Sequence, residues 1–139
     1  MPQSIRDLMT PDPVSLPSSA PLVQAAQCMK DRNIGDVVVT EDGRPCGIVT
    51  DRDIVIRAVA EGRQMDQTVL GDICSKALVT VSPTDTTDDA VRLMREQALR
   101  RLLVMDSGNA VGIVSIGDLA VDLDSASALA DISAAPPNQ

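Results

Sequence analysis

Two segments of the 139-residue chain carry a hydroxyl and a carboxylate at the same spacing. Residues 47–53 read GIVTDRD and residues 112–118 read GIVSIGD, so both contain Gly, two apolar residues, Thr or Ser, two variable residues and Asp. This pattern predicts a strand that ends at the hydroxyl and a helix that begins after it. The free N–H groups of a helix N-terminus favour phosphate, and an Asp can accept hydrogen bonds from two vicinal ribose hydroxyls. The pairs are Thr50 with Asp53, and Ser115 with Asp118.

The same spacing also has a purely structural explanation. Thr-x-x-Asp and Ser-x-x-Asp are capping-box spacings, in which the hydroxyl caps the helix and the carboxylate bonds back to the capping residue. Both segments could hold the motif only because both helices need a start. The two explanations are compatible, since a side chain that caps a helix in the empty protein can turn to a ligand.

Both motifs belong to a repeat that spans most of the chain. Residues 4–55 align with residues 69–120 at a constant offset of 65 residues, without an insertion. Each copy predicts a short turn, a brief strand, a helix, a β-hairpin and a second helix. The i, i+3, i+4, i+7 spacing puts four residues of each first helix on one face. These are Leu22, Ala25, Ala26 and Met29 in the first copy, and Thr87, Ala90, Val91 and Met94 in the second.

We therefore predict a mixed α/β (α+β) fold with two β-α-β-β-α repeats packed sheet to sheet, with pseudo-twofold symmetry. A unit of about 50 residues buries little core by itself, so the two copies should share one domain. The predicted strands are 14–16, 37–39, 46–49, 79–81, 102–105 and 111–114, and the predicted second helices are 52–61 and 117–122. The predicted boundaries are 1–61 for the first repeat, 62–68 for a linker, 69–123 for the second repeat and 124–139 for a flexible tail.

Composition excludes several classes of function. The chain has a formal net charge of −8 and contains no Phe, Trp, Tyr or His. An acidic chain repels phosphate backbones, and a chain without aromatic residues has no stacking platform for bases, so we expect no binding to DNA or RNA. Without histidine the chain lacks the usual general base and the commonest transition-metal ligand. We find no nucleophile elbow or metal cluster, and we expect neither catalysis nor a metal site.

Two further features indicate a soluble, cytoplasmic protein that makes no contact with a membrane. Cys28, Cys46 and Cys74 are odd in number, lie far apart and form no C-x-x-C motif, so we predict small buried or half-buried apolar residues rather than a disulfide or zinc framework. The N-terminus shows no signal peptide, and the longest uncharged apolar stretch is far shorter than a membrane span.

The apolar residues of the second helices exceed what one small core requires. Some of them should pack across a twofold axis, which predicts a homodimer. The residues concerned are Ile54, Val55, Ala58, Val59, Leu119, Val121 and Leu123.

The repeated unit, with Gly, two apolar residues and Thr/Ser-x-x-Asp at its last strand–helix junction, resembles a cystathionine-β-synthase (CBS) domain. Over about 4–122 the chain resembles a tandem CBS pair, also called a Bateman module. The resemblance implies two clefts that bind AMP, ADP or ATP, and sometimes S-adenosylmethionine or NAD-type ligands. It also implies regulation of an unknown partner without catalysis, and dimers formed through helical faces. A ligand-free interaction protein that has kept the fold and lost the sites is the alternative.

The resemblance places ribose on Asp53 and Asp118, with Thr50 and Ser115 beside the ribose or the phosphate. The residues before the first hairpin strand often carry a basic group toward the phosphate. The second copy has Arg100 and Arg101 there, and the first copy has Gly35 and Asp36.

We therefore expect the cleft with the arginines to bind a phosphorylated ligand better, because an Arg fork makes charge-assisted bonds and a carboxylate repels phosphate. Arg52 could compensate in the first copy. The structural alternative for Arg100 and Arg101 is a solvated helix end stabilised by its dipole. The family also suggests apolar residues against the adenine, and the candidates are Val14, Ile34, Val37, Leu78, Leu99 and Leu102.

Overall fold

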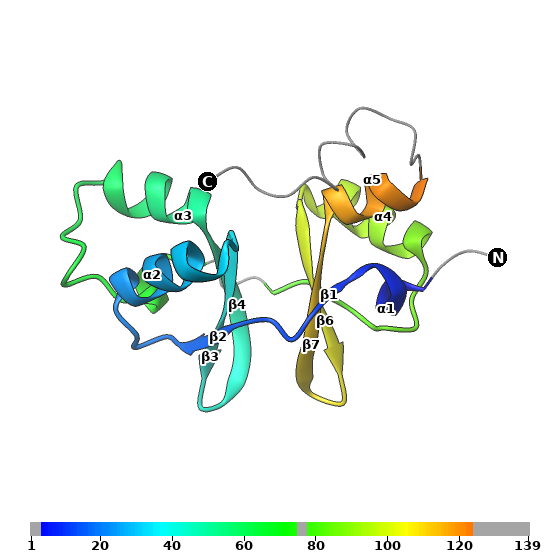
Figure 1. Cartoon of the computed structure of the whole chain (residues 1–139), viewed down its shortest axis with the longest axis horizontal. Helices are drawn as coiled ribbons and strands as arrows, with labels where there is room; N and C mark the ends of the chain where they lie inside the picture. Colours follow the sequence, from blue (N-terminus) through cyan, green and yellow to red (C-terminus); the bar gives the residue numbers. More distant parts are fainter. Residues whose placement is uncertain (1–3, 75–77, 124–139) are drawn as a thin grey trace. The chain divides into compact units, whose positions relative to one another are not determined.

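The chain folds into two compact units, each with one sheet and its own helices (Figure 1). The structure is a computed structural model that describes residues 4–74 and 78–123, with only the backbone of 121–123. The first unit is Val14–Leu78, and the second unit is Val79–Gln139 together with Met1–Pro13. The predicted tail at 124–139 lies outside the described residues. The predicted α+β fold with two sheets is confirmed.

The first unit holds a three-stranded sheet in the order β2-β3-β4. Strand β2 is parallel to β3, and β3 forms an antiparallel hairpin with β4. Its elements are β2 (Ser15–Pro17), α2 (Leu22–Arg32), β3 (Asp36–Glu41), β4 (Arg44–Thr50), α3 (Asp51–Ile54), the π-helix η1 (Val55–Val59) and the 3-10 helix η2 (Leu70–Asp72).

The second unit holds a four-stranded sheet in the order β1-β7-β6-β5. Strand β5 is parallel to β6, while β6 and β1 are both antiparallel to β7. Its elements are α1 (Ile5–Leu8), β1 (Thr10–Pro11), β5 (Thr80–Val81), α4 (Thr87–Gln97), β6 (Arg101–Asp106), β7 (Asn109–Ser115) and α5 (Ile116–Leu123).

Each unit takes its opening segment from the other sequence repeat. The Ile5 backbone N–H donates to the Asp85 carbonyl at 2.9 Å, and the Ile5 side chain is fully buried in the core of the second unit. In the first unit the Leu22 N–H donates to the Thr68 carbonyl at 2.8 Å, and Leu70 is fully buried. Figure 1 shows α1 and β1 beside the strands of the second unit. The packing units therefore differ from the sequence repeats, whose boundaries at 61 and 69 remain a prediction.

Local sequence signals explain most of the elements. Asp42–Gly43 and Ser107–Gly108 all have positive φ, as the tight turns of the two predicted hairpins require. Asn33 and Ala98 end α2 and α4 in the left-handed conformation. The buried face of each helix is narrower than predicted, since Ala26 is exposed and Val91 is only half-buried. The residues that form it are Leu22, Ala25 and Met29 in α2, and Thr87, Ala90 and Met94 in α4.

The second helix of the first repeat differs from the continuous helix predicted over 52–61. Only Asp51–Ile54 is α-helical, and Val55–Val59 widens into a π-helix. A π-helical turn has i→i+5 hydrogen bonds in place of the α-helical i→i+4 bonds, and such turns often lie at functional sites. In the second repeat α5 spans Ile116–Leu123, close to the predicted 117–122.

A substitution at Gly112 tests how closely the opening segment of the chain, which contains α1 and β1, packs on β7. A Cβ at this position would lie 2.5 Å from Met9 Sδ and 3.0 Å from the Thr10 carbonyl oxygen. We expect Gly112→Ala to destabilise the protein by about 1–3 kcal/mol, the usual cost of overpacking, measured by urea unfolding. Gly71→Ala is the control, because its new Cβ would have no neighbour closer than 3.4 Å. An equal loss of stability in both variants would contradict this account.

Candidate functional site

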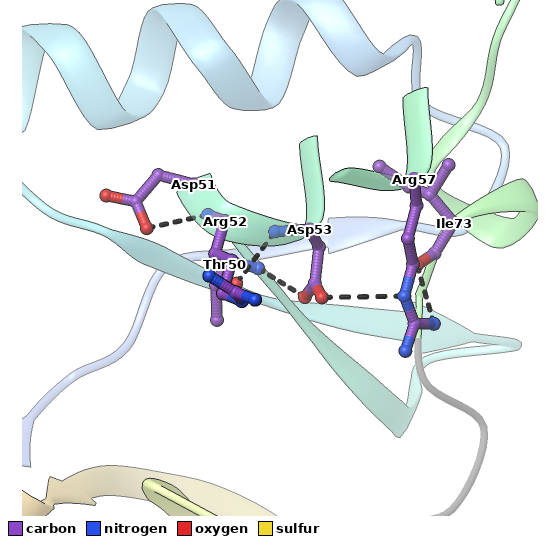
Figure 2. A network of polar contacts seen from close by, with 6 residues as sticks. All are labelled: Thr50, Asp51, Arg52, Asp53, Arg57 and Ile73. Atoms are coloured by element: carbon purple, nitrogen blue, oxygen red, sulfur yellow. Dashed lines mark hydrogen bonds and ion pairs between the residues drawn. The ribbon is translucent and has the colours of Figure 1, made fainter. Parts of the chain in front are cut away.

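The hydroxyl and carboxylate of the first motif form a capping box at the start of α3 (Figure 2). Thr50 is the last residue of β4, and its Oγ1 accepts a hydrogen bond from the Asp53 backbone N–H at 3.1 Å. Asp53 Oδ2 accepts a hydrogen bond from the Thr50 backbone N–H at 2.9 Å. These two hydrogen bonds fix the turn from strand to helix. Both side chains are half-buried, so part of each stays exposed to solvent.

The second motif has the same geometry at the start of α5. Ser115 Oγ accepts from the Asp118 N–H at 3.1 Å, and Asp118 Oδ2 accepts from the Ser115 N–H at 2.8 Å. The structural explanation of the motif is therefore correct in both repeats. It leaves ligand binding open, because a carboxylate offers about four lone-pair positions and the box uses one of them.

A third capping box shows that this geometry alone does not mark a ligand site. Thr86 and Asp89 begin α4 with backbone-to-side-chain distances of 3.1 and 3.2 Å, although no Gly-apolar-apolar sequence precedes them. The hydrogen bonds from Thr86, together with Arg92, hold the pKa of the Asp89 carboxyl below its ordinary value of 3.8. Asp89 is thus an internal control for the two motif carboxylates.

The strand register brings the proposed phosphate-side residues next to each motif. Arg101 lies opposite Ser115 in the β6–β7 ladder, and Asp36 lies opposite Thr50 in the β3–β4 ladder. The Ile116 N–H also donates to the Arg100 carbonyl at 2.9 Å. Arg101 is the first residue of β6 rather than part of a helix end. Each unit therefore collects a hydroxyl, a carboxylate and its own phosphate-side residue within one strand–helix junction.

Arg57 is a neighbour of the first motif that the sequence prediction missed. Its Nε lies 3.7 Å from Asp53 Oδ1, and its Nη1 donates to the Ile73 carbonyl at 3.3 Å (Figure 2). The i, i+4 spacing from Asp53 was the available signal. The corresponding position of the second repeat is Asp122, so the second repeat has no arginine there. Arg52, which was considered as compensation, donates its backbone N–H to Asp51 Oδ1 at 2.8 Å.

The apolar residues predicted to contact the adenine differ in how far their side chains are exposed to solvent. Val37 and Leu102 are fully buried in the cores of their units, so their side chains support the sheets. Four others are half-buried and present some surface, and these are Val14, Ile34, Leu78 and Leu99. Their contact with a ligand remains a prediction.

Neither a metal site nor a membrane span is present in the described part of the chain. Within 4–74 and 78–123, no three His, Cys, Asp or Glu side chains gather in a way that could hold a metal ion. No helix in these ranges is long and apolar enough to cross a membrane.

The lowered pKa of Asp89 predicts a pH-dependent contribution to stability. Because the folded pKa lies below the unfolded value, this contribution is present above pH 3.8 and is lost as pH falls through the folded pKa. Wild type should be more stable than Asp89→Asn at pH 7, and the difference should shrink in strong acid, measured by urea unfolding across pH.

Asp88→Asn is the matched control for this comparison. It removes a charge from the same exposed first turn and leaves the hydrogen bonds of Thr86 in place. A difference between wild type and Asp89→Asn that stays constant from pH 7 to pH 2.5 would contradict the prediction.

Comparison with known proteins identifies the same repeat. The family model for the CBS domain matches residues 5–59 and again residues 70–124. The CBS domain-containing protein YhcV of Bacillus subtilis is 40% identical over 119 residues, which cover 86% of this chain and 84% of that protein.

Two solved structures are similar over most of the chain. Hypoxic response protein I, a name also carried by a 30% identical relative from Mycobacterium tuberculosis, was solved with two coordinated zinc ions. Its superposition on this chain has a TM-score of 0.75 at 30% sequence identity, and the matched part covers 87% of this chain and 99% of that one. The hexameric CBS-CP12 protein from bloom-forming cyanobacteria has a TM-score of 0.81 at 28% identity, covering 89% of this chain and 74% of that one. With two matches of the family model and a 40% identical relative, the chain belongs to the CBS domain family and is a tandem CBS pair.

Proposed function

We propose that this CBS pair is a regulatory module that binds an adenine nucleotide, AMP, ADP or ATP, and has no catalytic activity of its own. The observation that carries the proposal is the junction of the second unit, where Arg101 lies opposite Ser115 and Asp118 caps the following helix. This junction combines a cation, a hydroxyl and a carboxylate, which suit a phosphate and a ribose respectively.

Capping and ligand binding can coexist at Asp118. The capping bond occupies one lone-pair position of Oδ2, and a ribose hydroxyl needs only one of the remaining positions. Asp118, Ser115 and Arg101 are all half-buried, so their polar groups are partly shielded from water. A hydrogen bond to a charged group contributes about 1.5–3 kcal/mol, so each of these side chains is expected to change affinity measurably.

The junction of the first unit is less suited to a phosphorylated ligand. Asp36 lies opposite Thr50, where a carboxylate would repel phosphate. Asp53 also has Arg57 at 3.7 Å, a contact that a ribose hydroxyl would have to share or displace. We therefore propose that the residues of the second unit provide most of the affinity for the phosphorylated part of the ligand.

A non-catalytic role is supported by the chemistry that the chain offers. The sequence contains no histidine, and relatives in this family carry names that refer to the domain or to a response rather than to a reaction. A ligand would act by binding two conformations with different affinity and so changing the contact with a regulated partner. The alternative is an interaction protein that binds no nucleotide, and it predicts no thermal stabilisation by any adenosine ligand.

Calorimetric titration with AMP and with ATP tests the nucleotide site. We expect Asp118→Asn and Arg101→Ala each to weaken binding by about tenfold or more, because each variant removes a charge-assisted contact. Asp89→Asn is the matched control, since it alters an equivalent capping box outside the motif and should leave affinity unchanged. Circular dichroism should confirm that each variant is folded. Unchanged affinity in both site variants would refute the proposed site, and the absence of binding to wild type would favour the ligand-free alternative.

We also propose self-association through the exposed apolar residues of the second helix in the first unit. Val55, Ile56 and Val59 expose 54, 47 and 57% of their surface, and Ile116 in the second unit exposes 51%. Ala58 and Leu119, which were also predicted for this interface, are instead buried in the cores of their own units. The side chains of Val121 and Leu123 lie outside the described residues.

Light scattering tests this self-association. Wild type should have at least twice the monomer mass, and Val59→Asp should shift the protein toward monomer, because a buried carboxylate at the interface costs free energy. Asn109→Asp places the same charge in the exposed hairpin of the second unit and should leave the mass unchanged. A wild-type protein that is monomeric at every concentration would overturn the proposal.

A further inference from the structure

An apolar groove runs between the two helices of the second unit. It lies between α4 and α5 and has a volume of about 350 Å³, and much of its wall is formed by Val91, Met94, Leu99 and Leu119. Ile116, the first residue of α5, also lines the groove and exposes 51% of its surface. Open apolar surface of this kind commonly marks a place where another segment or molecule packs. The groove is therefore a candidate docking surface.

The first unit has the equivalent groove, and there a segment that follows the second helix forms part of the wall. This groove has a volume of about 230 Å³, and Met65 lines it together with Leu22 of α2 and Ile54 of α3. Met65 is half-buried and packs against the first core. The segment is anchored three residues later, where the Thr68 carbonyl accepts a hydrogen bond from the Leu22 N–H at 2.8 Å. The chain after the second helix thus returns across the first helix in this unit.

The residues after α5 place large apolar side chains at the spacing that this packing requires. Met65 follows the last residue of η1 by six positions, and Leu129 follows the last residue of α5 by the same six. Leu129 and Ile132 are the two large apolar residues of 124–139. Six residues of extended chain span about 20 Å. The eight residues of α5 span only about 12 Å, so Leu129 can reach any part of the groove that α5 lines.

The groove and the segment also have complementary charges. Arg95 lines the groove, and no acidic side chain in the described part of the chain forms an ion pair with it. Residues 124–139 contain two acidic residues, Asp124 and Asp131, and no Lys or Arg. Asp131 lies between the two large apolar residues of the segment. An exposed ion pair contributes little free energy, so a pair of Asp131 with Arg95 would mainly set the direction of the segment.

We propose that residues 124–133 fold back along α5 and pack Leu129 and Ile132 into the groove between α4 and α5 of the same chain. Leu129 takes the place that Met65 has in the first unit. This arrangement differs from the flexible tail that composition predicts. It also covers Ile116, which keeps this residue from contacting a second copy of the chain and leaves self-association to the apolar residues of η1.

Methyl NMR of the full chain gives a direct test. The methyl groups of Ile, Leu and Val are isotope-labelled, and nuclear Overhauser cross-peaks are assigned for Leu129 and Ile132. We expect cross-peaks from these residues to methyl groups of Val91, Ile116 or Leu119. A second sample mixes labelled with unlabelled chains, and an isotope filter then selects contacts between chains. The expected cross-peaks should be absent from the filtered spectrum, because they join residues of one chain.

Matched variants measure what this packing contributes to stability. The double variant Leu129→Ser, Ile132→Ser should move the methyl resonances of Ile116 and Leu119 and lower the unfolding temperature by about 3–5 °C, because the groove loses its apolar cover. Ala135→Ser lies outside the proposed segment and should leave both the resonances and the unfolding temperature unchanged.

Two results would contradict this placement. Wild type without any cross-peak between the groove and Leu129 or Ile132 would have the flexible tail instead. Cross-peaks that appear only in the filtered spectrum would show that a second copy fills the groove. Because wild type is observed directly, neither result depends on the folding of a variant.

Discussion

The structure depends on the burial of two side chains from the opening turns of the repeats. Ile5 is fully buried in the second unit and Leu70 in the first, each reaching a core built mainly by the other repeat. Without Leu70 and Ile73 the first core would lose two of its largest fully buried side chains. The same placement brings the Ile73 carbonyl to the Arg57 side chain, so the position of this neighbour of the first motif depends on it.

The two units have diverged most where chemistry is possible. Arg101 in the second unit corresponds to Asp36 in the first, and Arg57 in the first corresponds to Asp122 in the second. Val111 and Met9 of the second unit correspond in sequence to Cys46 and Cys74 of the first. The shared parts are the hairpins and the capping boxes, which the backbone requires in both copies. A duplicated fold has therefore kept its structural residues and assigned different chemistry to its two halves.

Much of the fold was predictable because its signals are local. The Asp-Gly and Ser-Gly turns specify the hairpins, and the hairpins in turn place Arg101 opposite Ser115 and Asp36 opposite Thr50. The Thr/Ser-x-x-Asp spacing alone predicts the capping boxes. The exchange of the opening segments was not predictable, because it depends on which of two similar cores receives Ile5 and Leu70. The π-helical turn after Ile54 and the exposure of Ala26 likewise arise from tertiary packing, on which helical periodicity carries no information.

The exchange of opening segments also bears on how such a chain could arise. A single repeat that folded in this way would lack the opening turn that completes its core. Its own opening turn would have no core in which to be buried. Two identical copies of such a repeat could each supply the opening turn that the core of the other lacks, as Ile5 and Leu70 do within this chain. In one chain that holds both copies, this exchange does not depend on protein concentration, and each copy can change without changing the other. The differences between Arg101 and Asp36, and between Val111 and Cys46, show that the two copies in this chain no longer carry the same residues at these positions.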